Sequence, residues 1–322
     1  MLDLNDIIGN TPMIKINYCY NGKKKYVYAK LEFYNITGSI KDRVALYMIK
    51  NAEESGKLKK EMGIVEVTSG NTGIALAAAG KRFKHPVYIF MPDWVSKERV
   101  KLINQYGGKT FLYSKDDGGF LKCIKESQKF ADEIEGFKID QFSNYDNFLA
   151  HYETTGMEIV KQVPERIGAF ISGVGTGGTL MGCGKRIKEN YKDASIIAIE
   201  PDKMPIISEG KKISLHKIEG IGDEFVPKLI KKDEINKILL VNDDDAINMS
   251  KIISKELGLG VGISSGANFI GCVLANENIQ PATVTVFADD NKKYMSTELF
   301  DPIDNNHKYI SNKIKLINYE IV

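Results

Sequence analysis

One lysine and three polar, glycine-rich loops carry the residue types in this chain that could act together in catalysis. Lys41 lies in the stretch Gly-Ser-Ile-Lys-Asp-Arg at residues 38–43, and its amine could form an imine with a carbonyl group. The loops follow at residues 68–73, 173–179 and 262–268, and are rich in glycine, serine, threonine and asparagine. A lysine able to form an imine, a phosphate-binding loop and further polar loops are what an enzyme using pyridoxal phosphate (PLP) needs. Together, the four segments predict a PLP enzyme.

The second loop has the form of a phosphate-binding turn. Gly175-Thr176-Gly177-Gly178-Thr179 follows an apolar run typical of a strand and precedes a predicted helix. Backbone N–H groups and the helix N-terminus could therefore surround a phosphate. The loop is not a GxGxxG dinucleotide turn, and no Lys-Ser/Thr pair follows the glycines as in a P-loop, so nucleotide binding is disfavoured.

The first loop offers groups that suit a carboxylate. It also joins a predicted strand to a predicted helix, and Ser69, Asn71 and Thr72 supply hydroxyl and amide groups beside exposed N–H groups. An anion could bind there.

Each motif taken alone also has a purely structural explanation. Glycine-rich turns often serve packing only. Ser69 or Asn71 could simply cap the following helix. Asp42 and Arg43 beside Lys41 could be ordinary surface charge.

The elements that would position these loops alternate along the chain. Short apolar runs and longer amphipathic stretches follow one another, which is typical of βα units and a mostly parallel sheet. The predicted strands are residues 63–67, 86–91, 169–172, 195–200, 238–241 and 283–288. The predicted helices are residues 72–83, 96–106, 120–134 (after a lead-in at 109–113), a helix after 178, and 244–257. The fold class is therefore α/β.

Length and composition limit the remaining possibilities. A chain of 322 residues favours two domains over one and needs no disulfide or metal for stability. Lys and Arg number 44 against 42 Asp and Glu, so the net charge of +2 gives no reason to expect nucleic acid as a partner. The four cysteines form no CxxC or Cys/His cluster, which predicts buried, reduced thiols and a cytoplasmic protein.

Nothing in the sequence indicates a membrane partner. The acidic stretch Met1–Asp6 lacks the basic region and apolar run of a signal peptide, and no apolar segment is long enough to span a bilayer.

Several motifs occur in a fixed order from about residue 3 to about residue 300. They are Gly9-Asn10-Thr11-Pro12, residues 38–43, 68–73 and 175–179, Glu219-Gly220-Ile221-Gly222, and residues 262–266. In this order they resemble the cysteine synthase (O-acetylserine sulfhydrylase) and cystathionine β-synthase family, over nearly the whole chain.

The resemblance implies a specific architecture. Each of two domains would be an open, twisted, mostly parallel sheet flanked by helices, as in the tryptophan synthase β-subunit (fold type II of PLP enzymes). Residues 45–149 would form a smaller, mobile domain that closes over the substrate. Residues 1–44 plus 150–322 would form a larger domain that binds the PLP phosphate. The molecule would be a homodimer.

The resemblance also implies which residues bind the cofactor. Lys41 would hold PLP as an imine and later move the α-proton of the substrate, with its pKa lowered so that a neutral amine is available. Asn71 would hydrogen-bond the ring hydroxyl, and Ser264, or Ser265 if the register differs by one residue, would face the pyridine nitrogen. The phosphate would be bound by Gly175, Thr176, Gly177, Gly178 and Thr179.

The substrate would be bound by the other polar loop. Thr68, Ser69, Thr72 and Gln141 match the groups that hold the substrate α-carboxylate as the smaller domain closes. No metal is expected.

A serine at the pyridine nitrogen has a chemical consequence of its own. Unlike an aspartate, a neutral hydroxyl does not keep the ring protonated, and elimination at Cβ is then favoured over transamination. The expected reaction is β-replacement on a three-carbon amino acid such as L-cysteine, L-serine or O-acetyl-L-serine. The β-substituent would leave, and sulfide or water would add.

The residues after Gly222 depart from the family pattern. Cysteine synthases usually have two small residues there, whereas this chain has Asp223 and Glu224, and serine-using cystathionine β-synthases tend to have an acid at the second position. A carboxylate could act as a base on water or as an acid on the leaving group, and would repel bisulfide. We therefore hypothesise that Asp223, with Glu224 as second choice, favours conversion of L-cysteine and water to L-serine and hydrogen sulfide. Alternatively, both acids face solvent or bind a lysine such as Lys228.

Two other reactions fit the same motifs. One is plain O-acetylserine sulfhydrylase activity, which makes L-cysteine from O-acetyl-L-serine and sulfide. The other is β-elimination of the serine or threonine dehydratase type. Phe120, where related enzymes often carry Met, either narrows the pocket or is ordinary packing. The polar tail from Asp304 to Val322 suggests no chemistry.

Overall fold

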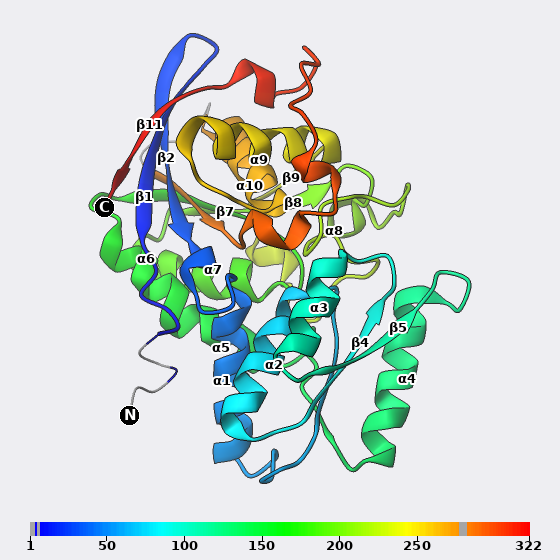
Figure 1. Ribbon diagram of the computed structural model, residues 1–322. Helices are drawn as coiled ribbons and strands as arrows, with labels where there is room; N and C mark the ends of the chain where they lie inside the picture. The colour runs from blue at the N-terminus through cyan, green and yellow to red at the C-terminus, as the bar shows by residue number, and fades with distance from the viewer. Residues whose placement is uncertain (1–3, 5–6, 277–281) are drawn as a thin grey trace.

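Two separate sheets with helices on both faces make up the molecule (Figure 1). The computed structural model describes Leu4, residues 7–276 and residues 282–322, so most of the acidic stretch at the N-terminus lies outside the described residues. One sheet has seven strands and the other has four. Both sheets are mostly parallel, which confirms the predicted α/β fold class.

The seven-stranded sheet has a parallel centre and an antiparallel edge. In spatial order the strands are β11 (Lys315–Ile321), β1 (Met13–Tyr20), β2 (Lys23–Leu31), β10 (Ala282–Phe287), β7 (Ile167–Gly173), β8 (Ser195–Pro201) and β9 (Lys237–Val241). From β2 to β9 every neighbouring pair is parallel, whereas β1 pairs antiparallel with both β2 and β11. The central strands are buried on both faces, as expected for parallel strands covered by helices.

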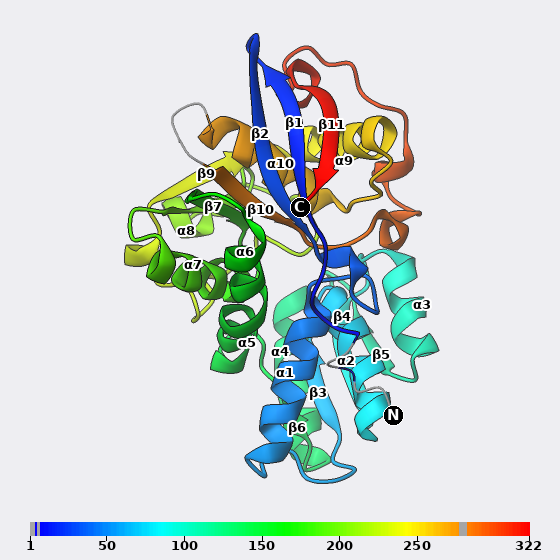
Figure 2. The same cartoon turned by 90° about the vertical axis from the view of Figure 1, so that its left-hand side faces the viewer.

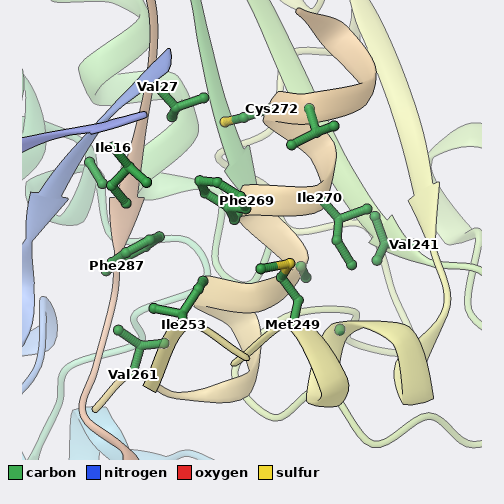
Figure 3. Packing of buried hydrophobic residues seen from close by; sticks show 14 of the residues in the cluster. Ile16, Val27, Val241, Met249, Ile253, Val261, Phe269, Ile270, Cys272 and Phe287 are labelled. Atoms are coloured by element: carbon green, nitrogen blue, oxygen red, sulfur yellow. The ribbon is translucent and has the colours of Figure 1, made fainter. Parts of the chain in front are cut away.

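Helices cover both faces of this sheet. One face packs against α9 (Asp243–Leu257) and α10 (Ile263–Ala275), where Phe269 and Cys272 of α10 lie among strand residues (Figure 3). The other face packs against α6 (Gly156–Gln162) and α7 (Gly178–Asn190). We call this sheet and these helices the seven-stranded part.

The four-stranded sheet is parallel throughout. Its strands in spatial order are β5 (Lys109–Tyr113), β4 (Val87–Pro92), β3 (Ile64–Val67) and β6 (Phe137–Lys138). One face packs against α1 (Lys41–Glu54), α2 (Asn71–Phe83) and α3 (Lys97–Gln105), and the other against α4 (Gly119–Glu133). We call this assembly the four-stranded part; it lies below the seven-stranded part in Figure 1, and Figure 2 shows the same arrangement from the side.

Shorter elements complete the described chain. They are α5 (Tyr145–Ala150), a π-helical turn (His151–Thr155), α8 (Ile206–Glu209), and the 3-10 turns Glu32–Tyr34, Lys232–Glu234, Asn291–Tyr294, Glu298–Phe300 and Ser311–Lys313.

The main features that the sequence prediction missed are the antiparallel edge and the two helices α1 and α10. β1 and β2 form a hairpin whose turn, Asn21-Gly22, has positive φ angles of 50° and 73°. An Asn-Gly pair is typical of such tight turns. The C-terminal tail ends in β11, an edge strand in which only Leu316 is buried. The end of the tail therefore extends the seven-stranded sheet by pairing with β1.

The cysteines agree with the prediction of free thiols. Cys123, Cys183 and Cys272 are buried, Cys19 is partly exposed, and all four are free. Within the described ranges, no helix is both long and apolar enough to cross a membrane.

Candidate active site

Most of the predicted site residues meet in one cavity between the two parts of the molecule. The loops that follow β3 and β7 form opposite walls, in keeping with ligand sites at the carboxyl ends of parallel strands. Of the predicted residues, those that line the cavity are Lys41, Thr68, Ser69, Asn71, Thr72, Gln141, Gly175, Thr176, Gly177, Thr179, Asp223 and Ser264. Gly178 is buried beside it, and Glu224 lines a neighbouring hollow.

Lys41 is the first residue of α1, and backbone contacts fix the turn before it. The N–H of Ile40 donates to the carbonyl of Ala288 at 2.8 Å, which ties the turn to the end of β10. Within the turn, the N–H and hydroxyl of Thr37 both donate to Asp42, at 3.0 and 2.7 Å. The lysine side chain is thereby held at the cavity wall.

The charged residues after Lys41 are buried, which rules out the alternative that they are surface charge. Asp42 is 2% exposed and Arg43 is 3% exposed. Arg43 forms ion pairs with Glu32 at 2.7 Å and with Glu158 at 2.6 Å, so it links α1 to the seven-stranded part. The first turn of α1 is therefore held by Asp42, which binds the preceding turn, and by Arg43, which binds the seven-stranded part.

The electrostatics at Lys41 favour a neutral amine. Burial lowers the pKa of the Lys41 amine, while the carboxylates of Asp223 and Asp289 oppose that shift. A neutral amine is the form that attacks a carbonyl or accepts a proton.

The loop after β7 wraps the end of the cavity where α7 begins. Gly177 has φ +87°, a conformation that favours glycine, and a Cβ on Gly175 would lie 2.4 Å from the carbonyl oxygen of Gly220. The hydroxyl of Thr176 accepts a hydrogen bond from Asn147 at 2.8 Å. The bare backbone and the N-terminus of α7 suit a phosphate.

The loop after β3 forms the other wall of the cavity, which Thr68, Ser69 and Thr72 line. Thr72 donates its hydroxyl to Gln141 at 2.6 Å, and the Gln141 amide donates to the carbonyl of Val67 at 3.0 Å. The residue before α2 is Gly70, and among the described residues no side chain caps the helix there. Capping therefore does not account for Ser69 and Asn71.

These residues fit PLP. Lys41 can bind it covalently, residues 175–179 can hold its phosphate, and the Ser264 hydroxyl is available at the cavity wall. The Oδ1 atom of Asn71 is buried and has no partner among the residues that the structure describes, so a ligand in the cavity could satisfy it.

The two neighbouring acids lie in different environments. Asp223 lines the cavity with Lys41, and burial raises the pKa of its carboxyl to about 6, although Lys41 opposes the shift. Glu224 is exposed and pairs with Lys212, rather than with the predicted Lys228. Asp223 is therefore the carboxylate that could reach a reacting group.

Sequence reasoning assigned no role to several buried side chains around the cavity. Arg99 of α3 is fully buried and pairs with Glu219 at 2.9 Å across the two parts. His151 contacts the hydroxyl of Thr179 at 3.2 Å, and burial lowers the pKa of His151 well below its ordinary value. Asp289 accepts a hydrogen bond from Asn71 at 2.8 Å. Of these residues, only Glu219 lies in a motif that the sequence analysis used. The burial of the others could not be predicted, because it depends on partners distant in the chain.

Within the part of the chain that the structure describes, no group of three His, Cys, Asp or Glu side chains could hold a metal ion.

Known proteins resemble both the sequence and the structure. The family model described as pyridoxal-phosphate dependent enzyme matches residues 4–289. A cysteine synthase of Staphylococcus aureus is 38% identical over 303 residues, which cover 92% of this chain and 96% of that protein.

Two solved structures from Fusobacterium nucleatum, both described as hydrogen sulfide-producing enzymes, have the same fold. One is 46% identical with a TM-score of 0.94 and covers 99% of this chain and 98% of its own. The other is 36% identical with a TM-score of 0.85 and covers 92% and 100%.

Proposed function

Because the chain belongs to the PLP-dependent enzymes, in the family of the cysteine synthases and cystathionine β-synthases, we propose that it converts L-cysteine and water to L-serine and hydrogen sulfide. Its general chemistry, PLP-dependent β-replacement of the cysteine synthase type, follows from that membership. The observation that carries the choice of water is the position of Asp223 in the cavity beside Lys41.

The residues of the cavity divide the work of binding and proton transfer. When bound, PLP supplies an electron sink that makes the α-proton of the amino acid acidic. Lys41, with its lowered pKa, accepts that proton. The α-carboxylate of the substrate is held by Thr68, Ser69 and Thr72, which follow β3, together with Gln141, whose side chain accepts the hydrogen bond of the Thr72 hydroxyl.

Asp223 acts on the β-substituent and on the incoming water. Its proton goes to the departing sulfur as the Cβ–S bond breaks, so that hydrogen sulfide leaves. The resulting carboxylate takes a proton from water as the new Cβ–O bond forms, and Lys41 returns its proton to Cα. With a pKa of about 6, Asp223 can be both donor and acceptor near neutral pH.

The similarity to the hydrogen sulfide-producing enzymes of F. nucleatum supports this reaction. The similarity to cysteine synthases favours a second candidate, the synthesis of L-cysteine from O-acetyl-L-serine and sulfide. That reaction needs no base on water, so the two candidates differ in their need for Asp223.

The Asp223→Asn variant tests the proposal. We expect sulfide release from L-cysteine to fall about 100-fold, the scale of a lost general acid or base, and cysteine formation from O-acetyl-L-serine to change less than about threefold. In the wild type, sulfide release should fall as pH rises through about 6, because the protonated Asp223 carboxyl is the form that donates to the departing sulfur, and the variant should lack that fall. Product analysis by mass would detect pyruvate and ammonia from a dehydratase-type reaction. Equal losses in both reactions would contradict the role of Asp223.

Assembly, motion and location complete the proposal. We expect a cytoplasmic homodimer in which residues 45–149 close over the bound amino acid. Light scattering after size exclusion tests the dimer, and small-angle scattering with and without L-serine tests the closure.

A further inference from the structure

The backbone of Ala288 and Asp289, which follow β10, hydrogen-bonds the segment before Lys41 and the segment before Ser264. The carbonyl of Ala288 accepts the N–H of Ile40 at 2.8 Å, next to Lys41 in the chain. The carbonyl of Asp289 accepts the N–H of Gly262 at 2.9 Å, at the start of the loop that carries the cavity serine. Asp289 therefore lies between two predicted cofactor contacts.

The side chain of Asp289 contacts a third predicted cofactor-binding residue, Asn71. Its Oδ2 atom accepts hydrogen bonds from the amide of Asn71 and the hydroxyl of Tyr294, both at 2.8 Å, and lies 3.7 Å from the guanidinium of Arg99. Asp289 is only 1% exposed. A carboxylate can only accept hydrogen bonds, so it fixes the Asn71 amide with its nitrogen toward Asp289. The amide oxygen of Asn71, unpartnered within the described chain, is the end left for a ligand.

Packing and protonation around Asp289 are consistent with a fixed carboxylate. A Cβ on Gly262 would lie 1.9 Å from the Oδ1 atom of Asp289, so only a bare backbone can pass this close. Burial and the neighbouring carboxylate raise the pKa of Tyr294 well above its ordinary value. The Tyr294 hydroxyl therefore stays protonated and donates.

We propose that Asp289 is a positioning residue, whose carboxylate orients Asn71 toward the bound cofactor while Tyr294 and Arg99 hold that carboxylate in place. Asn71 and Arg99 belong to the four-stranded part, whereas Asp289 and Tyr294 follow the last central strand of the seven-stranded part. The orientation is therefore complete only when the two parts are together. The proposal depends on Asn71 facing PLP and not on which nucleophile the enzyme uses.

The absorbance spectrum of the PLP-loaded enzyme tests this role. The Asp289→Asn variant keeps the shape of the side chain and loses its charge. We expect a changed ratio of the visible absorption bands of the bound cofactor and an about tenfold lower kcat/KM, the scale of one lost hydrogen bond to a charged group. In an Asn71→Ala background, the same change should have little further effect, because the residue being oriented is gone.

Two further variants separate positioning from stability. Asp245 is also a buried carboxylate, but it accepts the backbone N–H groups of Ile310 and Ser311 away from the cavity. Asp245→Asn should lower the melting temperature and leave the spectrum unchanged. Tyr294→Phe should shift the spectrum in the same direction as Asp289→Asn, by a smaller amount, and serves if Asp289→Asn does not fold. A wild-type spectrum in Asp289→Asn and Tyr294→Phe, or additive losses with Asn71→Ala, would overturn the proposal.

Discussion

The two walls of the cavity are built from different kinds of contact. On the seven-stranded side, Gly175 packs backbone against backbone, directly against Gly220, whereas Gly177 and Gly178 of the same loop face the side chains of Ile230 and Asn147. On the four-stranded side, the loop after β3 is held through side chains. There Arg99 contacts Glu219 and Asp289, which belong to the other part of the molecule.

This difference indicates which wall can move. A backbone contact between glycines has no rotamer to change, so the phosphate side of the cavity is fixed by the fold. Ion pairs and ring contacts between two parts can break and re-form without unfolding either sheet. We expect the four-stranded part to open and close against a rigid phosphate site.

Among the contacts on the four-stranded side, loss of the Arg99 ion pairs should lower stability most. Arg99→Met keeps the length of the side chain but leaves Glu219 and Asp289 without their shared cation. We expect the free energy of unfolding, measured in urea on the PLP-loaded enzyme, to fall by about 3–5 kcal/mol.

A surface pair provides the control for Arg99. Lys129 and Glu133 are 3.7 Å apart with side chains 69% and 57% exposed, so Lys129→Gln should change the same quantity by less than about 0.5 kcal/mol. Losses of similar size in both variants would show that burial does not make the Arg99 contacts important.

The backbone wall should be sensitive to a single methyl group. A Cβ on Gly175 would lie 2.4 Å from the carbonyl oxygen of Gly220, which cannot rotate away, so Gly175→Ala should cost about 1–3 kcal/mol of stability. PLP should also bind about tenfold more weakly, measured by fluorescence titration of the PLP-free protein.

A helical glycine serves as the comparison for Gly175. In Gly184→Ala the atoms nearest to the new Cβ would belong to the Ile196 side chain, at 3.1 Å, which can shift more easily than backbone. That variant should bind PLP normally. Equal loss of affinity in both variants would mean that the phosphate side is not specifically rigid.

The sequence predicts most of the parallel strands well because their information is local. Parallel strands and the helices between them carry their own periodicity, and α2, predicted at 72–83, begins only one residue earlier, at Asn71. β11 gives no such pattern, because it is mostly exposed and pairs with β1 at the opposite end of the chain. The hairpin had a local indication in Asn21-Gly22 that the prediction did not use.

The site divides in the same way. Loops that follow strands and contain glycine could be found from the sequence, and the structure brings them to one cavity. The burial of Arg99 could not be found, because its partners lie more than a hundred residues later in the chain. The separation of Asp223 from Glu224 could not be found either, because it depends on how one loop turns between the two parts.

A ring cluster offers a milder way to loosen the side-chain wall. Phe225 of the seven-stranded side meets Phe142 edge to face, with ring centroids 5.0 Å apart, and lies 6.4 Å from the ring of Phe120. Phe225→Leu should raise the KM for L-cysteine about two- to tenfold with kcat nearly unchanged, because a ring contact contributes about 0.5–1.5 kcal/mol to closure. Phe120 thus belongs to a contact between the parts as well as to packing.

The control for Phe225 is a stack within one helix. Tyr145 and Phe148 of α5 stack with centroids 4.8 Å apart, and Tyr145→Leu should leave the KM within about twofold of the wild type, as expected for a surface change. If kcat fell in Phe225→Leu and KM did not change, the cluster would be acting on the chemical step rather than on closure.

Among these variants, substitution of Glu224 should have the smallest effect on activity. It compares two neighbouring acids, one in the cavity and one at the surface. The Glu224 carboxylate pairs with Lys212 at the surface, and both side chains are more than 40% exposed. Glu224→Gln and Lys212→Gln should each change kcat/KM for sulfide release by less than about twofold, because an exposed pair contributes little. If Glu224→Gln instead lost activity as Asp223→Asn does, the loop would have to turn over during catalysis. Part of the wall near Gly222 would then be as mobile as the four-stranded side, and the contrast between the two walls would not extend to this loop.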